Sequence, residues 1–159
     1  MRGKIKTEKE LHKELCRHRA SGRRIVFTNG CFDLLHVGHV RYLEEAKSLG
    51  EILVVAINSD RSTSRLKGPS RPINSQQDRA EVLAALACVD YVTIFDEPDP
   101  HRIISVLRPH ILVKGGDWTR ETTIGREIVE NEGGKVVVVP YVKGVSTTTI
   151  IDRIVKSLD

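Results

Sequence analysis

The sequence predicts an α/β protein, with a single Rossmann-like, doubly wound domain built on a parallel five-stranded sheet with helices on both faces. Short apolar runs alternate with helical patterns along the chain, which favours parallel strands joined by right-handed crossovers. The run ILVVAI at 52–57 is apolar throughout, as is typical of a strand covered on both faces. The 159 residues suit one domain, 1–159, in which 1–22 form an N-terminal helical extension.

The elements of the first half follow from local signals. Thr7 is a suitable N-cap for a helix over 8–19, in which Leu11 and Leu15 lie one turn apart. A strand over 25–28 leads into a helix over 38–49, which ends at Gly50. After the strand 52–57, the segment 58–74 is polar and contains Gly68, Pro69 and Pro72, so we expect a long mobile loop.

The second half repeats this alternation. Ser75 caps an expected helix to residue 87, in which Val82, Leu83 and Leu86 share one face. The remaining expected elements are strands over 91–95, 110–113 and 135–139, short helices over 100–107 and 123–131, and a last helix after Ser146. In that last helix we expect apolar residues to point inward: Ile150, Ile151, Ile154, Val155 and Leu158.

Composition narrows the function. The net charge of +4, from 25 basic and 21 acidic residues, suits a small anionic substrate and is too low to indicate nucleic acid without a basic patch. No apolar stretch approaches the roughly 20 residues that span a bilayer, and the N-terminus lacks a signal-peptide core, so we expect no membrane association. Cys16, Cys31 and Cys88 form no CxxC pair, which argues against a zinc site or disulfide framework and suits a reducing cytoplasm.

The segment 27–39, FTNGCFDLLHVGH, carries the strongest functional signal. It joins a strand to a helix, so backbone N–H groups and a positive helix end are available to phosphate. His36 and His39 flank Gly38, which permits close approach of a ligand, and their imidazoles can donate hydrogen bonds as charge develops. We expect Cys31 to be a small buried filler rather than a reactive thiol, and Asp33 to hold the turn rather than a metal. The expected nucleotide-binding residues of this turn are Thr28, Asn29, Gly30, Cys31, Phe32 and Gly38.

Three further segments follow predicted strand ends, where doubly wound sheets bind ligands. Arg65, Lys67 and Arg71 place cations in the segment after the second strand, where they could close over a triphosphate, and we expect Arg79 to reach the same phosphates. The segment KGGDW, with Lys114, Gly115, Asp117 and Trp118, is either a tight turn or a contact for a base or sugar. The hydroxyls of Ser146, Thr147 and Thr148 cap the last helix and would bind phosphate there. The expected substrate contacts are Asp33, Asn58, Asp60, Arg65 and Arg71.

Several enzyme classes are disfavoured. The chain has neither a GxGxxG dinucleotide motif nor a GxxxxGK[ST] phosphate loop, and no local spacing suggests a Ser-His-Asp or Cys-His arrangement. Many donors without an obvious nucleophile suit nucleotidyl transfer, in which the protein positions groups and stabilises charge. A non-catalytic nucleotide-binding module remains an alternative.

The HVGH element after GCFD resembles the cytidylyltransferase-like nucleotidyltransferases of the HxGH superfamily. With NSDRSTSRLKGPSRPIN, LVKGGDW and GVSTTTII, over about 24–154, the chain resembles D-glycero-β-D-manno-heptose 1-phosphate adenylyltransferases, which are often the C-terminal part of a bifunctional enzyme. A cytidylyltransferase acting on glycerol 3-phosphate is the related alternative. It is disfavoured because Tyr141 stands where that relative has Arg.

The resemblance implies a Rossmann-like fold and the reaction of ATP with heptose 1-phosphate, with Mg²⁺ accompanying ATP and no dedicated metal site. It implies that His36 and His39 contact the nucleotide phosphates, that Lys67 and Arg79 hold the triphosphate, and that Ser146, Thr147 and Thr148 bind phosphate. It also implies a separate heptose kinase as a pathway partner and a homodimer or higher oligomer.

Overall fold

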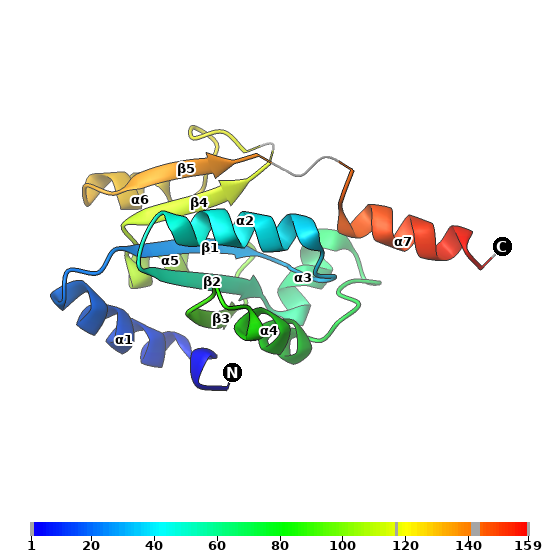
Figure 1. Ribbon diagram of the computed structural model, residues 1–159, viewed down its shortest axis with the longest axis horizontal. Helices are drawn as coiled ribbons and strands as arrows, with labels where there is room; N and C mark the ends of the chain where they lie inside the picture. The colour runs from blue at the N-terminus through cyan, green and yellow to red at the C-terminus, as the bar shows by residue number, and fades with distance from the viewer. Residues whose placement is uncertain (1, 117, 141–143, 159) are drawn as a thin grey trace.

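Five parallel strands form one sheet in the order β3-β2-β1-β4-β5 (Figure 1). The computed structural model describes residues 2–116, 118–140 and 144–158. The strands are β1 Ile25–Gly30, β2 Ile52–Asn58, β3 Tyr91–Phe95, β4 Ile111–Gly115 and β5 Lys135–Val139. The helices are η1 Arg2–Lys4, α1 Glu8–Ala20, α2 Val37–Ser48, α3 Asp60–Lys67, α4 Gln76–Ala85, α5 His101–Leu107, α6 Arg126–Asn131 and α7 Thr147–Lys156. This is the doubly wound α/β domain that the sequence predicts.

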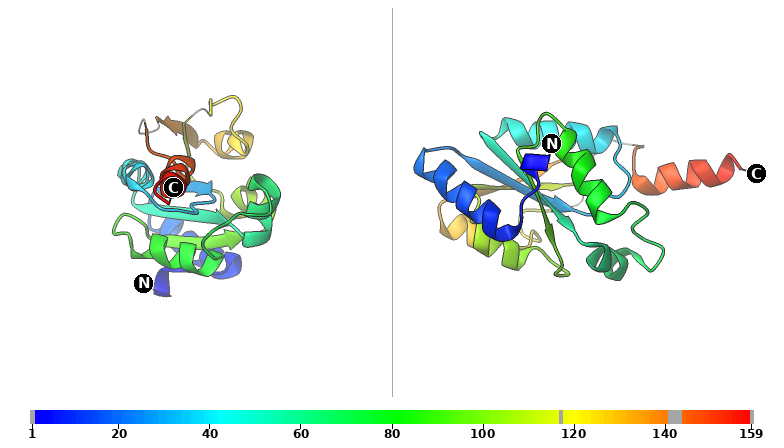
Figure 2. Two further views of the ribbon diagram at one scale, coloured as in Figure 1. Left: turned by 90° about the vertical axis from the view of Figure 1, so that its right-hand side faces the viewer. Right: turned by 90° about the horizontal axis from the view of Figure 1, so that it is seen from below.

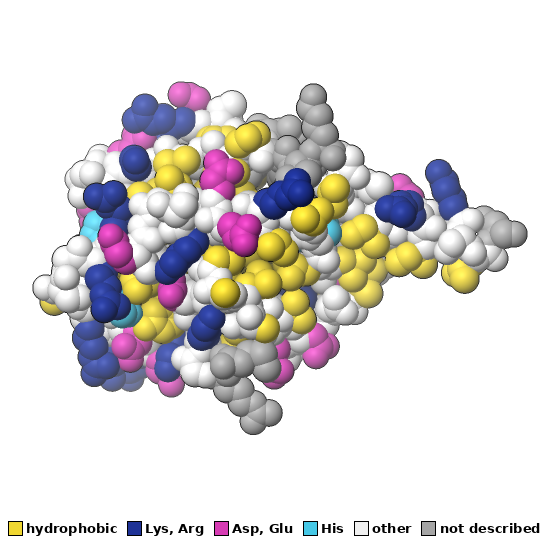
Figure 3. Space-filling model, viewed as in Figure 1, with side chains coloured by type: hydrophobic (Ala, Val, Ile, Leu, Met, Phe, Trp, Pro, Cys, Tyr) yellow, Lys and Arg dark blue, Asp and Glu magenta, His cyan; other side chains and the backbone are white. Residues whose placement is uncertain are grey.

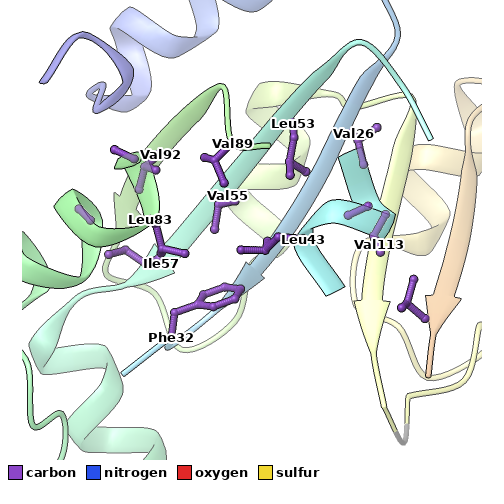
Figure 4. Packing of buried hydrophobic residues seen from close by; sticks show 14 of the residues in the cluster. Val26, Phe32, Leu43, Leu53, Val55, Ile57, Leu83, Val89, Val92 and Val113 are labelled. Carbon is purple, nitrogen blue, oxygen red and sulfur yellow. The ribbon is translucent and has the colours of Figure 1, made fainter. Parts of the chain in front are cut away.

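Two apolar layers cover the two faces of the sheet. On one face, Leu43 and Ala46 of α2 and Leu83 of α4 pack against Val55 and other strand side chains (Figure 4). The other face packs against α1, α5 and α6 through residues that include Leu11, Leu15, Ile104, Leu107 and Val129. Every residue of β2 is buried, which confirms the expectation of a strand covered on both faces.

The N-terminal segment is part of this packing. A capping box joins Thr7 and Glu10 at the start of α1, as the sequence predicts for the cap residue. Ile5 makes a parallel bridge to Val92 of β3, and the N–H of Lys6 donates to the Val92 carbonyl at 2.9 Å. Residues 5–20 therefore extend the fold beyond β3 and supply part of the core.

The expectation of a loop over 58–74 is wrong, because residues Asp60–Lys67 form helix α3. The hydroxyl of Ser59 accepts a hydrogen bond from the N–H of Ser62 and so caps the helix. The helix ends at Gly68, whose φ of 101° lies in a region that favours glycine. Pro69 and Pro72, which suggested a loop, lie beyond this end. The loop indicated by Gly68, Pro69 and Pro72 is therefore real, but the prediction wrongly extended it over the residues of α3.

The expected inward faces of α4 and α7 are also partly wrong. Val82 is 49% exposed, because α4 turns Ala80, Leu83 and Ala84 toward the sheet. Among its described residues α7 buries none. Ile154 in the helix is 52% exposed, and Leu158, just beyond its end, is 82% exposed. Figure 2 shows that α7 projects from the carboxyl edge of the sheet instead of packing on a face. Helix α6 begins at Arg126, three residues later than expected.

Candidate active site

A cavity of about 850 Å³ lies at the carboxyl ends of the strands. Its walls come from the β1–α2 turn, the end of β2, the end of α3 with the segment after it, the β3–α5 loop, the end of β4 and the start of α7. In Figure 1 the arrowheads of β1 and β2 point toward this edge, where α3 and the start of α7 lie. The cavity thus occupies the edge at which parallel α/β sheets bind ligands.

His36 and His39 stand at the N-terminus of α2. The N–H of His39 donates to Nδ1 of His36 at 3.4 Å, so the His36 side chain is the N-cap of the helix. An Nδ1 atom that accepts must lack a proton, which assigns the proton of neutral His36 to Nε2. The capping bond therefore leaves His36 with one N–H donor for a ligand.

The two imidazoles stack, with ring centroids 3.8 Å apart and planes inclined by 20°. Burial, together with the neighbouring His36, lowers the pKa of His39 to about 4, and burial also lowers the pKa of His36. Both rings are therefore neutral near pH 7. Nδ1 of His39 is buried and has no hydrogen-bond partner among the described residues, so an unmet polar atom lies beside the cavity.

Phe32 supports this pair from the turn. Its φ of 48° is unusual for a residue with a side chain, and such strain is often found at functional sites. Its ring lies 5.1 Å from the ring of His39, centroid to centroid. A Cβ atom on Gly30 would come within 3.1 Å of the Phe32 ring, so glycine leaves room for the aromatic side chain. Gly30 and Phe32 thus shape the turn that carries the histidines.

Helix α7 brings a second capped N-terminus to the cavity. The hydroxyl of Ser146 accepts a hydrogen bond from the N–H of Thr149 at 3.0 Å. Thr147 donates its hydroxyl to the carbonyl of Leu34 at 3.4 Å, which ties the start of α7 to the β1–α2 turn. Hydroxyl donors and a positive helix end therefore face the same space as the histidines.

Asp33 holds the segment after α3 against the β1–α2 turn. Its carboxylate accepts hydrogen bonds from Nε of Arg71 at 2.5 Å and from the N–H groups of Ile73 and Asn74 at 2.8 and 2.9 Å. Burial opposes ionisation, but these N–H groups and the guanidinium together hold the pKa of Asp33 below its usual value. The expectation that Asp33 holds the turn agrees with these contacts. Arg71 and Lys67 line the cavity at this side.

Arg79 does not reach the cavity. Its guanidinium is fully buried and donates to the carbonyls of Cys31 and Asn74 and to the carboxylate of Asp60, at 2.6, 3.1 and 2.8 Å. These bonds use Nε, Nη1 and Nη2. The expected phosphate contact is therefore corrected: in this structure Arg79 positions the β1–α2 turn and the start of α3.

Lys114 lies at the opposite side of the cavity, near the end of β4. Its ammonium group donates to Oδ1 of Asn29 in β1 and lies 5.5 Å from the centroid of the Trp118 ring. Only 6% of the residue is exposed, and burial lowers its pKa to about 8. Lys114, the first residue of the KGGDW segment, therefore belongs to strand β4.

The cytidylyltransferase-like family model matches residues 27–153 of the chain. This stretch contains all of the described residues that line the cavity. It belongs to the cytidylyltransferase-like family. Membership confirms the family resemblance that the HVGH element indicates.

Several relatives of this family member are bifunctional. The chain is 56% identical over 151 residues to the bifunctional protein HldE of Syntrophotalea carbinolica, covering 95% of the chain and 31% of the relative. It is 53% identical over 154 residues to the HldE protein of Geobacter sulfurreducens, covering 97% of the chain and 31% of the relative. The chain therefore spans about a third of the length of these relatives.

Two solved structures share the fold. A lipopolysaccharide core biosynthesis protein from Thermoplasma volcanium is 31% identical, with a TM-score of 0.62 over 78% of this chain and 100% of that chain. A pantoate-β-alanine ligase from Francisella tularensis is 19% identical, with a TM-score of 0.60 over 97% of this chain and 78% of that one. The second likeness concerns the fold alone.

Most of the predicted site residues of this cytidylyltransferase-like chain line the cavity. These are Asn29, Gly30, Cys31, Phe32, Asp33, His36, Gly38, His39, Asn58, Lys67, Arg71, Lys114, Gly115, Trp118, Ser146, Thr147 and Thr148. Thr28 does not, because it is buried in β1 and its hydroxyl pairs with that of Tyr42 at 2.6 Å. Asp60 and Arg65 also lie outside the lining, and Asp117 and Tyr141 lie outside the described residues.

Sequence reasoning missed Tyr42 and Ile124 in the lining and left the role of 98–100 open. Tyr42 lies one turn after Gly38, so its helical spacing from the histidine motif was an available signal. Ile124 and the β3–α5 loop, with Asp99, carry no local pattern that marks a site. They reach the cavity only through the fold.

The described residues form no group of three His, Cys, Asp or Glu side chains that could hold a metal ion. Asp33, the most buried carboxylate of the lining, is already engaged by Arg71 and backbone N–H groups. Among the helices described here, none has both the length and the apolar character needed to cross a bilayer.

Proposed function

We propose that this chain transfers AMP from ATP to D-glycero-β-D-manno-heptose 1-phosphate, giving ADP-heptose, a lipopolysaccharide or surface-glycan precursor, and pyrophosphate. The observation that carries nucleotidyl transfer is the convergence of His36, His39 and two capped helix N-termini on one cavity that also holds Lys67 and Lys114. The choice of ATP and heptose 1-phosphate rests on the resemblance of RLKGPSRPIN and VKGGDW, and on 56% identity with an HldE protein.

The reaction needs no covalent enzyme intermediate. A phosphate oxygen of the sugar 1-phosphate attacks the α-phosphorus of ATP, a new P–O bond forms, and the bond from the α-phosphorus to the oxygen that bridges to the β-phosphate breaks. The electron pair of that bond leaves with pyrophosphate. Negative charge grows on the phosphoryl oxygens, and preorganised donors stabilise it.

The residues divide this task among them. The Nε2–H of His36 and the ring of His39 supply donors to the phosphates, and Ser146, Thr147 and Thr148 bind phosphate at the start of α7. Lys67 and Arg71 hold the triphosphate from the side of α3. Asn29, Gly115 and Trp118 surround the nucleoside, whereas Asn58 lies toward the sugar phosphate.

Mg²⁺ would enter as the companion of ATP. The described residues do not fit a protein cage for it, since the lining carboxylates Asp33 and Asp99 already accept hydrogen bonds from N–H groups of the chain. The ion would therefore be held by phosphate oxygens, as is common for Mg²⁺ in phosphoryl-transfer sites. No step above depends on a metal ligand from the chain.

The proposal implies partners. A kinase activity would supply the heptose 1-phosphate, and a reducing cytoplasm suits the free thiols of Cys16, Cys31 and Cys88. A homodimer is supported by the exposed apolar side chains of Ile154 and Val155 in α7 and of Leu158 just beyond it. Figure 3 shows hydrophobic side chains along the projecting helix and on the neighbouring body of the protein. Light scattering of the wild type and of Ile154→Asp would test this: a dimer that the variant halves supports it, and a monomeric wild type contradicts it.

Pyrophosphate release is the deciding experiment. The chain is incubated with ATP or CTP and with heptose 1-phosphate or glycerol 3-phosphate, in all four combinations. Release with ATP and heptose 1-phosphate above the other pairs supports the proposal. Preference for CTP and glycerol 3-phosphate supports the related transferase, and tight ATP binding without release for any pair supports a non-catalytic module.

A further inference from the structure

The cations around the cavity differ in how their charge is balanced. Arg71 pairs with Asp33, and Arg79, behind the wall, pairs with Asp60. Lys67 is exposed to solvent. Lys114 is neither paired with a carboxylate among the described residues nor solvated, since only 6% of the residue is exposed. Within the described parts of the chain, its ammonium group contacts only the neutral amide of Asn29 and the aromatic ring of Trp118.

A buried ammonium group without a counter-ion is costly, because burial removes water and neither Asn29 nor Trp118 carries a negative charge. Burial alone is the cause that lowers the pKa of Lys114, to about 8. The group also lies at the end of a parallel strand and lines the cavity. An anion inside the cavity would therefore gain more from Lys114 than from a solvated lysine.

The sheet order separates Lys114 from the other cations. β1 stands between β2 and β4, and Lys67 and Arg71 follow β2, whereas Lys114 belongs to β4. The cations thus flank the β1–α2 turn, with its histidine pair, from two sides. The other titratable groups of the described lining are Cys31 and Asp33 in the turn, His36 at the N-cap of α2, His39 and Tyr42 in α2, and Asp99 in the β3–α5 loop.

We propose that Lys114 binds a phosphate group of a substrate, and that this phosphate is the counter-ion that the described residues around Lys114 do not provide. The proposal rests on the proposed function for the identity of the substrates and extends it with a role for one residue. The phosphate belongs either to the nucleotide or to the sugar 1-phosphate, and both sources share the chemistry that the ammonium group recognises.

Binding of this kind takes up protons. A phosphate beside Lys114 favours its charged form and raises its pKa, so protein that was partly neutral becomes fully protonated. Since the pKa is about 8 in the free protein, binding at pH 8 should take up about half a proton at this residue. Near pH 6.5 the uptake from Lys114 should vanish, because the group is already charged.

Calorimetric titration at pH 8, in two buffers of different ionisation enthalpy, measures this uptake directly. ATP, heptose 1-phosphate and adenosine are titrated separately, so that the arm with proton uptake identifies the source of the phosphate and adenosine serves as the phosphate-free probe. Lys114→Arg keeps a permanent charge and should bind the phosphate ligand with the uptake lost. Lys114→Met should lower the affinity for that phosphate ligand about tenfold or more.

Lys135→Met, at the opposite end of the sheet, is the matched control and should leave affinity and uptake unchanged. The proposal is overturned if Lys114→Arg takes up as many protons as the wild type, or if folded Lys114→Met binds both phosphate ligands normally. Should Lys114→Met not fold, the comparison of Lys114→Arg with the wild type still decides. Uptake through Lys114 without pyrophosphate release would support this inference while contradicting the proposed reaction.

Discussion

Helices α2 and α7 both present a capped N-terminus to the cavity, yet they are anchored in different ways. His36 caps α2 and Ser146 caps α7, each by accepting the N–H three residues later. The body of α2 buries Leu43 and Ala46 in the core, whereas α7 buries none of its described residues. Local capping can thus aim a helix end at a site, but only packing fixes the rest of the helix.

The largest effect is expected for His39→Ala on turnover. Losing a donor that stabilises transition-state charge typically lowers kcat by about two to three orders of magnitude. The fold should persist, because α2 keeps Leu43 and Ala46 in the core. Steady-state pyrophosphate release and thermal unfolding measure the two effects, with substitution of the exposed His101 at the start of α5, His101→Ala, as control. Near-normal turnover of the folded variant would remove His39 from the reaction.

Next comes packing. Leu43→Ala should lower the free energy of unfolding by about 2–5 kcal/mol, because it opens a cavity under α2. Ile154→Ala in α7 should change it by less than about 0.5 kcal/mol in the monomer, because that side chain is 52% exposed. Denaturant titration at low protein concentration measures both. Equal losses in the free energy of unfolding for Leu43→Ala and Ile154→Ala would mean that α7 is packed as tightly as α2.

Acid should weaken the α2 end of the site. The pKa of His39 is about 4 in the folded protein and about 6.5 when unfolded, so the unfolded state binds the extra proton as pH falls through this window. Stability should therefore drop between pH 6.5 and 4 by about 2–3 kcal/mol. His39→Gln should flatten this part of the curve.

Asp33 provides the internal reference for that experiment. Because the pKa of Asp33 is lower in the folded than in the unfolded protein, its carboxylate stabilises the folded state at pH values above the unfolded-state pKa. This contribution to stability is lost separately, as the pH falls through the folded-state pKa of Asp33. This second loss should remain in His39→Gln. An unchanged pH profile in that variant would mean that His39 is not the group that titrates.

The smallest effect is expected at the cap of α7. Ser146→Ala should cost the helix about 1 kcal/mol and raise the KM for the nucleotide several-fold. The global unfolding midpoint should hardly move, since α7 contributes no buried side chain. Ser157→Ala, at the other end of α7, is the matched control. A KM equal to that of the wild type would show that the α7 end does not touch the nucleotide.

Much of the site could be predicted because parallel strands bring their carboxyl ends to one edge. The segments after β1, β2, β4 and β5 all line the cavity, as their positions in the chain indicated. Arg79 and Thr28 were misplaced for the same reason as Val82: a chain position near a site does not tell whether a side chain turns toward the cavity or the core. Arg79 lies in the buried face of α4, one turn before Leu83.

The sequence by itself determined the alternation of strands and helices apart from α3, the caps at Thr7, Ser75 and Ser146, and the two-faced burial of β2, because these depend on local periodicity and on hydrogen bonds within a few residues. Only the tertiary structure decided that His36 caps α2 with Nδ1, that Arg79 is a buried clamp, and that Lys114 is a cation without a carboxylate partner among the described residues. Charge balance and tautomer depend on groups brought together from distant strands. The exposed face of α7 belongs to the same class, since amphipathic spacing shows that a face is apolar but not what covers it.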